Sequence, residues 1–244
     1  MLPQPITHGT HVTGLRGTDY NDSGPKAVSC YAISAMFKVI RMVKRGDKLP
    51  AEFRQEWLER NRELRKAASQ LVASVAAEGN ILPGEPLFHG FAALYYPAVP
   101  EARAAHEKDI GKDALSTITE EKVLYERTGA TLKPMGQLKV VFTSIRKKEL
   151  SPAQYKDAAL KGYAKVDSKM LKESGIQKIV ASFAAPDQGG NPAFDSMLEI
   201  YFKDSDGLKA AFASPVISTL RKDEEALVRL DAPELRIVAE EHVL

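Results

Sequence analysis

Residues 37–51 read FKVIRMVKRGDKLPA, and residues 138–153 read LKVVFTSIRKKELSPA. Each stretch begins as a run of Val, Ile and Phe typical of a strand, passes a basic segment, and reaches a Pro that predicts a helix start. Farther along, FHGFAALYY at 88–96 matches FDSMLEIYF at 194–202. The offset between matched segments grows slowly, as small loop insertions would produce. The sequence therefore predicts one unit that was duplicated within the chain.

Each predicted copy has the order βαββαβ. In the first copy we expect strands at 36–45, 72–80, 87–96 and 122–127, with helices from Pro50 and over 100–112. In the second we expect strands at 137–146, 176–185, 194–203 and 234–243, with helices over 152–173, 206–220 and 222–229. This is the ferredoxin-like split βαβ arrangement, in which both helices cover one face of the sheet. Two such sheets packed face to face would make an α+β barrel, so the fold class is α+β with tandem ferredoxin-like repeats.

The expected boundaries are an N-terminal arm at 1–33, repeat 1 at 34–130 and repeat 2 at 136–244. The arm is rich in Gly, Thr, Pro and Asp and lacks periodicity. The chain has 244 residues, enough for two cores, and a net charge of +2. This charge gives no support for nucleic-acid binding. The single cysteine, Cys30, excludes an internal disulfide. No apolar run reaches membrane-span length and no secretory signal is evident, so we expect a cytoplasmic protein without membrane contact.

Three segments resemble the EthD family of dimeric α+β barrels. They are the strand and helix from Lys38 to Trp57, the strand from His89 to Tyr96, and the chain end with Ser214-Pro215, Lys222-Asp223 and 239–241. The resemblance covers about 36–244 in two copies. It implies small cytoplasmic proteins associated with ether or aromatic degradation, or with polyketide dehydration or decarboxylation without a metal. The family usually has a histidine in the first helix, and this chain has Asn61 and Tyr163 there.

Alternation along the two matched strands predicts which side chains share a face. One face has His89, Phe91, Ala93 and Tyr95, and the equivalent face has Asp195, Met197, Glu199 and Tyr201. The opposite faces are apolar and should lie under the helices. The mixed faces should therefore line the space between the repeats.

These faces supply the candidate active site. A histidine exchanges protons near neutral pH, and a carboxylate or phenol in an apolar cleft can be shifted toward that range. We expect His89 with Tyr95, or Asp195 with Glu199 and Tyr201, to act as the acid–base group. The candidate catalytic residues are His89, Tyr95, Asp195 and Tyr201, and the candidate substrate-binding residues are Trp57, Phe91, Met197, Glu199 and His242. The competing interpretation is a satisfied polar seam between the sheets.

The functional hypothesis is proton-transfer chemistry (dehydration, cyclisation, isomerisation or lyase cleavage) on a hydrophobic aromatic or polyketide-like small molecule. It calls for no metal and no other cofactor, and a homodimer of such pseudo-dimers stays open. One alternative is a binding or structural barrel without catalysis. Another is a haem-binding tandem barrel, for which His106 is a poor axial ligand. The His8–His11 segment resembles a protease histidine motif, but the chain lacks the partners that such a triad needs.

Overall fold

The computed structural model describes residues 37–78, 85–108, 114–186, 191–232 and 235–244. The expected arm, with His8, His11 and Cys30, lies outside these residues. The N-terminal half contains β1 (Phe37–Val43), α1 (Pro50–Leu64), β2 (Gln70–Ala76), β3 (Gly90–Tyr96), α2 (Val99–Lys108) and β4 (Ala114–Glu126). The C-terminal half contains β5 (Met135–Ser144), α3 (Pro152–Tyr163), α4 (Ser168–Glu173), β6 (Ile176–Ala184), β7 (Ser196–Phe202), α5 (Ser205–Ala213), α6 (Pro215–Lys222), the short 3-10 turn η2 (Glu224–Ala226) and β8 (Leu235–Val243).

Several expected elements differ from those observed. The helix expected over 206–220 is divided into α5 and α6, and the stretch expected as a helix over 222–229 holds the short turn η2. Strand β4 begins at Ala114, eight residues before the expected strand, because its buried positions include Thr117 and Thr119, whose polarity hides the apolar alternation. The single helix expected over 152–173 is two helices, α3 and α4. Asp167 begins the second one by accepting a hydrogen bond from the backbone N–H of Lys169 at 2.8 Å.

The eight strands form one closed antiparallel barrel in the order β1-β3-β2-β8-β5-β7-β6-β4. Within each half the strand order is fourth, first, third, second. The halves join edge to edge, through β2 with β8 and through β4 with β6. The expected face-to-face packing is thus only part of the arrangement. Closure gives every described strand two neighbours and removes the free edges through which another chain could pair.

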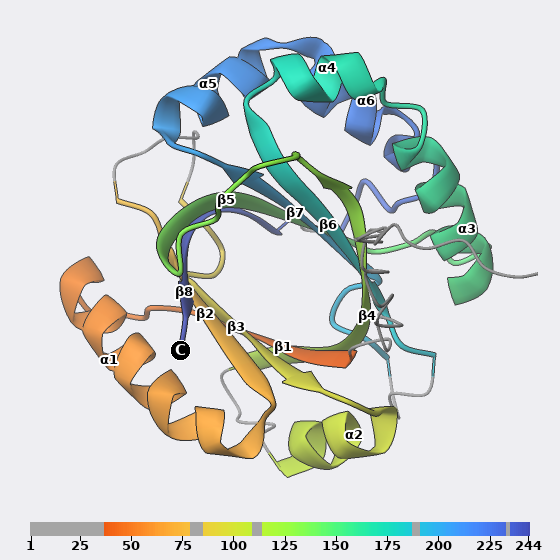
Figure 1. The fold of residues 1–244 in the computed structure, drawn as a ribbon. Helices are drawn as coiled ribbons and strands as arrows, with labels where there is room; N and C mark the ends of the chain where they lie inside the picture. Colours follow the sequence, from red (N-terminus) through yellow and green to blue (C-terminus); the bar gives the residue numbers. More distant parts are fainter. Residues whose placement is uncertain (1–36, 79–84, 109–113, 187–190, 233–234) are drawn as a thin grey trace, which may run out of the picture. The chain divides into compact units, whose positions relative to one another are not determined.

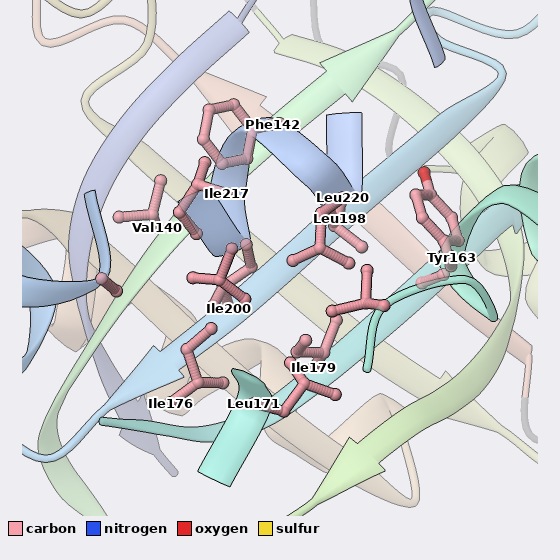
Figure 2. Close-up of a cluster of buried hydrophobic side chains, with 14 of the residues drawn as sticks. Val140, Phe142, Tyr163, Leu171, Ile176, Ile179, Leu198, Ile200, Ile217 and Leu220 are labelled. Carbon is pink, nitrogen blue, oxygen red and sulfur yellow. The ribbon is translucent and has the colours of Figure 1, made fainter. Parts of the chain in front are cut away.

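The helices lie outside the barrel, with α1 and α2 over the N-terminal strands and α3 to α6 over the C-terminal strands (Figure 1). Each set buries an apolar core against the outer face of its sheet. The core of the C-terminal half is drawn in Figure 2, where side chains such as Leu198 and Ile200 of β7 meet Ile217 and Leu220 of α6. None of the described helices combines the length and apolarity that crossing a membrane would require.

The inner face of the barrel holds a third cluster that both halves contribute to. Its fully buried members are Ile40, Met42, Phe91, Val141, Phe194, Met197, Ile237 and Ala239. The predicted alternation is confirmed within β3 and β7, since Leu94 and Leu198 lie in the helix-covered cores while Phe91 and Met197 lie inside.

Gly90 shows how tightly α1 packs on its sheet. A Cβ atom at this position would lie 3.0 Å from Phe53 Cζ and 3.0 Å from Trp57 Cε2, and both side chains are buried. We expect Gly90→Ala to lower the free energy of unfolding by about 1–3 kcal/mol, the usual effect of overpacking, measured by urea denaturation. Gly207→Ala in α5 is the control, because its Cβ would meet nothing closer than 3.4 Å and alanine favours helix. Equal midpoints for Gly90→Ala and the wild type would contradict this account.

Candidate functional site

The barrel interior brings together three predicted residues, Tyr95, Glu199 and Tyr201, in a buried charge network. The Glu199 carboxylate binds Lys38 Nζ through Oε2 and Lys139 Nζ through Oε1, each at 2.7 Å. The two lysines come from opposite halves of the chain and are 1% exposed. Glu199 therefore links the halves at the centre of the barrel.

Two further carboxylates complete this network. Lys38 also binds Glu121 at 2.9 Å, and the Tyr95 hydroxyl donates to the same carboxylate at 3.1 Å. Correspondingly, Lys139 also binds Glu241, and the Tyr201 hydroxyl donates to Glu241 at 2.9 Å. The residues pair by position in the barrel: Lys38 with Lys139, Tyr95 with Tyr201, and Glu121 with Glu241. Glu199 has Ala93 as its equivalent.

The contacts within this network shift the pKa values of its ionisable groups away from neutral pH. Burial acts to raise the pKa of Glu199, but the charges of Lys139 and Lys38 outweigh it and leave the pKa well below its usual value. Burial acts to lower the pKa of Lys38, yet Glu199 and the neighbouring Tyr95 and Glu121 hold it well above its usual range. Burial, together with nearby carboxylates, raises the pKa of both Tyr95 and Tyr201. A group that exchanges protons with a substrate needs a pKa near the working pH, so these shifts favour the interpretation of this network as a satisfied polar seam between the sheets.

Among the described residues, one group of inward-facing side chains leaves little space between them. Phe91 and Met197 pack there with Met42 and Val141, and the cavity between them measures about 10 Å³. That is about the space of one water molecule. Phe91 and Met197, both predicted to bind substrate, line this small cavity.

His89 lies apart from Tyr95, so the predicted pair is wrong. The histidine precedes β3, and its ring meets Phe53 of α1 edge-on, outside the barrel. The backbone N–H of Arg45 donates to Nδ1 at 3.3 Å, and Nε2 lies 2.9 Å from Glu85 Oε1. We expected His89 to follow the alternation of strand side chains. It does not, because it precedes Gly90, the first residue of β3. Moreover, six residues of strand span about 20 Å, which would separate the two groups in any case.

His242 also differs from its expected place between the repeats. Its Nε2 lies 3.3 Å from the guanidinium of Arg54 on α1, on the outer side of β8, whereas Glu241 points into the barrel. Burial and the charge of Arg54 lower the pKa of His242. On β8 it is therefore Glu241, and not His242 as the sequence pattern indicated, that faces the space between the repeats.

Asp195 is the predicted residue that lines a cavity of useful size. It precedes β7, as His89 precedes β3, and is separated from Glu199 by about 13 Å of strand. Its Oδ1 lies 2.9 Å from Arg146 Nε, and its Oδ2 accepts from the Arg146 backbone N–H at 2.9 Å. The adjoining cavity, which we call the seam cavity because it opens where β4 pairs with β6, has a volume of about 380 Å³.

The seam cavity combines an apolar wall with four charged groups. Its apolar lining consists of Tyr155, Phe183, three prolines and three alanines. Its charged lining consists of Asp195, Arg146, Lys156 and Glu120, the last contributed by the N-terminal half. Lys156 Nζ binds Glu120 across the seam and lies 5.9 Å from the centre of the Phe183 ring. A volume of this size suits a small ligand, and a carboxylate beside an ammonium can move a proton and stabilise the resulting anion.

Trp57 lies at a different place from Asp195. It packs under α1, where its indole N–H donates to the Ser74 carbonyl at 3.1 Å, and it is 3% exposed. Its edge contributes to a wide groove of about 1020 Å³. The groove wall is formed largely by exposed α1 side chains such as Glu59 and Arg60, so it lacks the enclosure of the seam cavity.

The sequence interpretation missed several residues. Arg146 belongs to no motif that indicates chemistry, and Lys156 lies on the face of α3 that no periodicity marks. Tyr155 follows Pro152 as Phe53 follows Pro50, a pattern that indicates a core position. Lys38 and Lys139 could have been found, because the paired motifs FKV and LKV put a lysine on the inward face of two otherwise apolar strands.

Comparison with known proteins finds one family match, over part of the chain. Residues 147–231 match the EthD domain family. The matched segment includes most of the seam cavity lining, while repeat 1, expected at 34–130, lies outside it. No curated protein matches the chain.

Solved structures agree in fold. An anthrone oxidase-like protein superposes with a TM-score of 0.57 at 10% identity, covering 86% of this chain and 93% of that chain. A proposed monooxygenase from Fusobacterium nucleatum has a TM-score of 0.49 at 12% identity, with the same coverages of 86% and 93%. A chlorite dismutase variant from Candidatus Nitrospira defluvii has a TM-score of 0.46 at 11% identity, covering 85% and 92%. At these identities the first likeness shows the α+β barrel fold alone.

Removing Glu199 should destabilise the barrel strongly. Glu199→Ala leaves two buried ammonium groups without their shared partner, and we expect a loss of about 3–5 kcal/mol in chemical denaturation at neutral pH. Glu173→Ala is the control, because its 4.0 Å pair with Lys169 is exposed and should contribute less than about 0.5 kcal/mol.

The same variant predicts a pH dependence. Because the pKa of Glu199 is lowered in the folded state, its contribution is fully present above the unfolded pKa of about 4.3 and declines below it. The stability difference between wild type and Glu199→Ala should therefore shrink as the pH falls below about 4.3. A difference that is constant with pH, or that grows in acid, would contradict an ionised Glu199.

Proposed function

We propose that the chain binds a hydrophobic aromatic small molecule in the seam cavity and catalyses proton transfer on it. The observation that carries the proposal is the convergence of the Asp195–Arg146 and Lys156–Glu120 pairs on one apolar cavity of about 380 Å³. Phe183 and the Tyr155 ring, which pack edge to face on each other, form the aromatic part of the cavity lining.

In this mechanism Asp195 removes a proton from a carbon or oxygen of the ligand. Arg146 holds the carboxylate from two sides, which fixes its direction. The ammonium of Lys156, 31% exposed on the opposite lip, stabilises the anion that forms. This donor set supplies both an acceptor and an electrostatic partner, so the proposed step calls on no metal and no nucleotide.

A second candidate is binding without turnover. Both oxygens of Asp195 are engaged by Arg146, which favours a carboxylate that orients a ligand over one that takes its proton. The two candidates share the cavity and the ligand class. They differ only in whether a proton moves.

We also propose that the halves are tandem ferredoxin-like repeats, 34–130 and 136–244, behind an arm at 1–33. Their common element order, their common strand order and the paired positions of Lys38 with Lys139 support this interpretation. The proposed setting is a cytoplasmic protein whose partner is the small molecule.

Proton transfer can be followed with anthrone, an aromatic ketone with exchangeable C–H groups, chosen after the named structural neighbour. In deuterated buffer, we expect the wild type to accelerate loss of the methylene proton signal in NMR. Asp195→Asn should reduce the exchange rate about 100-fold, the usual contribution of a general base. His89→Gln is the matched control, since His89 occupies the equivalent position in the other half, away from the seam cavity, and should leave the rate unchanged.

Binding is measured alongside by thermal shift with anthrone and with hydroxylated naphthalenes. A shift that Phe183→Ala abolishes, without any proton exchange, would establish the binding protein instead. If the wild type shows no proton exchange and no thermal shift with any of these compounds, the seam cavity is ruled out as the site.

A further inference from the structure

A chain of buried polar groups lies directly beneath the seam cavity. The Tyr155 hydroxyl is 2.7 Å from Ser196 Oγ, and it also interacts with Ser144. Ser144 in turn donates its hydroxyl to the carboxylate of Glu224, on the turn η2 after α6. Tyr155 is 1% exposed and Glu224 is 4% exposed, so the chain is shielded from water. Burial, with the charge of Glu224 second, raises the pKa of Tyr155, and its hydroxyl keeps its proton.

In the N-terminal half, the described positions equivalent to Ser144, Tyr155 and Ser196 carry no polar side chain. Ser144 faces Ser196 across β5 and β7, and the corresponding pair across β1 and β3 is Val43 with Gly90. Phe53 takes the place of Tyr155 and packs on Gly90. At these three positions the N-terminal half therefore packs apolar groups where the C-terminal half has hydroxyl groups.

This asymmetry indicates a role outside folding. Burying hydroxyl groups and a carboxylate is costly unless they are paired, and an apolar replacement is often neutral or stabilising. The N-terminal half shows which apolar residues this backbone accepts. Local departures from the simplest packing are expected where a site must be held.

The polar chain is attached to the cavity at two points. The Asp195 backbone N–H donates to the Ser144 carbonyl at 2.8 Å, and Ser196 directly follows Asp195. Tyr155, at the other point, forms part of the cavity wall. A shift of Ser144 or Ser196 would therefore move the Asp195 carboxylate and the aromatic wall relative to each other.

We infer that Ser144, Tyr155, Ser196 and Glu224 are positioning residues that hold Asp195 and the cavity wall in register. The inference rests on the proposed function, because it assigns these groups to the same site. Glu224 acts through Ser144 and touches no ligand. Its second oxygen, Oε2, lies 3.6 Å from Arg221 Nε, which orients the carboxylate from the side of α6.

The test replaces the polar chain with apolar residues. At Ser144, Tyr155 and Ser196 these are the residues found at the equivalent positions of the N-terminal half. The variant combines Ser144→Val, Tyr155→Phe, Ser196→Gly and Glu224→Leu. We expect its urea midpoint to equal or exceed that of the wild type, while the second-order rate of anthrone exchange falls by about tenfold or more, or anthrone affinity falls as far if the protein only binds. Ser74→Ala is the control: it removes another fully buried hydroxyl, on β2 inside the barrel, and should alter neither measurement.

A folded four-residue variant with wild-type exchange and affinity would overturn the inference. Failure of the wild type to bind or exchange anthrone would instead count against the proposed function, so the two failures are distinguishable. If the combined variant does not fold, Tyr155→Phe alone keeps the ring and should still weaken anthrone affinity or exchange.

Replacement of Glu224 separates positioning from general packing. Glu224→Gln keeps an oxygen that accepts from Ser144, and we expect exchange within about twofold of wild type. Glu224→Leu removes the acceptor at similar volume, and we expect a loss of about tenfold with little change in the urea midpoint. Equal activity for the two variants would contradict a role that runs through Ser144.

Discussion

One carboxylate, that of Glu199, bridges two buried lysines that come from opposite halves of the chain. A buried ammonium that loses its partner costs several kcal/mol, so the closed barrel depends on this shared contact more than on any exposed ion pair. The consequence for function is direct. Because Lys38, Lys139 and Glu199 satisfy one another, and apolar side chains fill the mouth beside them, the barrel interior serves as structure. Our proposal therefore places the chemistry at the seam cavity, on the outer, helix-covered side.

Much of the architecture could be predicted from the sequence, because it follows from patterns that repeat along the chain. The apolar runs at 37–43 and 138–144 and the prolines that begin α1 and α3 determine strand and helix order. Sequence could not show that the sheets join by their edges, since register between distant strands depends on contacts that no local pattern encodes. Nor could it show that His89 leaves the strand alternation, because one residue outside the regular strand changes the direction of a side chain.

The candidate site was predictable only in part for a related reason. Asp195 was identified as an ionisable residue beside an apolar strand, but its partner Arg146 comes from a neighbouring strand end and Glu120 from the other half. A cavity is the space left between elements, so it depends on side-chain volumes summed over distant segments. Tyr155 illustrates the point: as the match of Phe53 it predicts core packing, and only its hydroxyl contacts in three dimensions connect it with Glu224.

The position of Glu199 also explains why the two halves are unequal. Its carboxylate lies 2.7 Å from both lysines and therefore near the axis that relates the halves. A second copy of the C-terminal half would bring a second Glu199 to the same place, and two carboxylates that close repel each other. Two N-terminal halves would present Ala93 there and lose the contact that joins them. Only the pairing of one N-terminal half with one C-terminal half puts a single carboxylate at this place. Because a single chain holds two unequal halves together, the outer site of one half is free to diverge from that of the other.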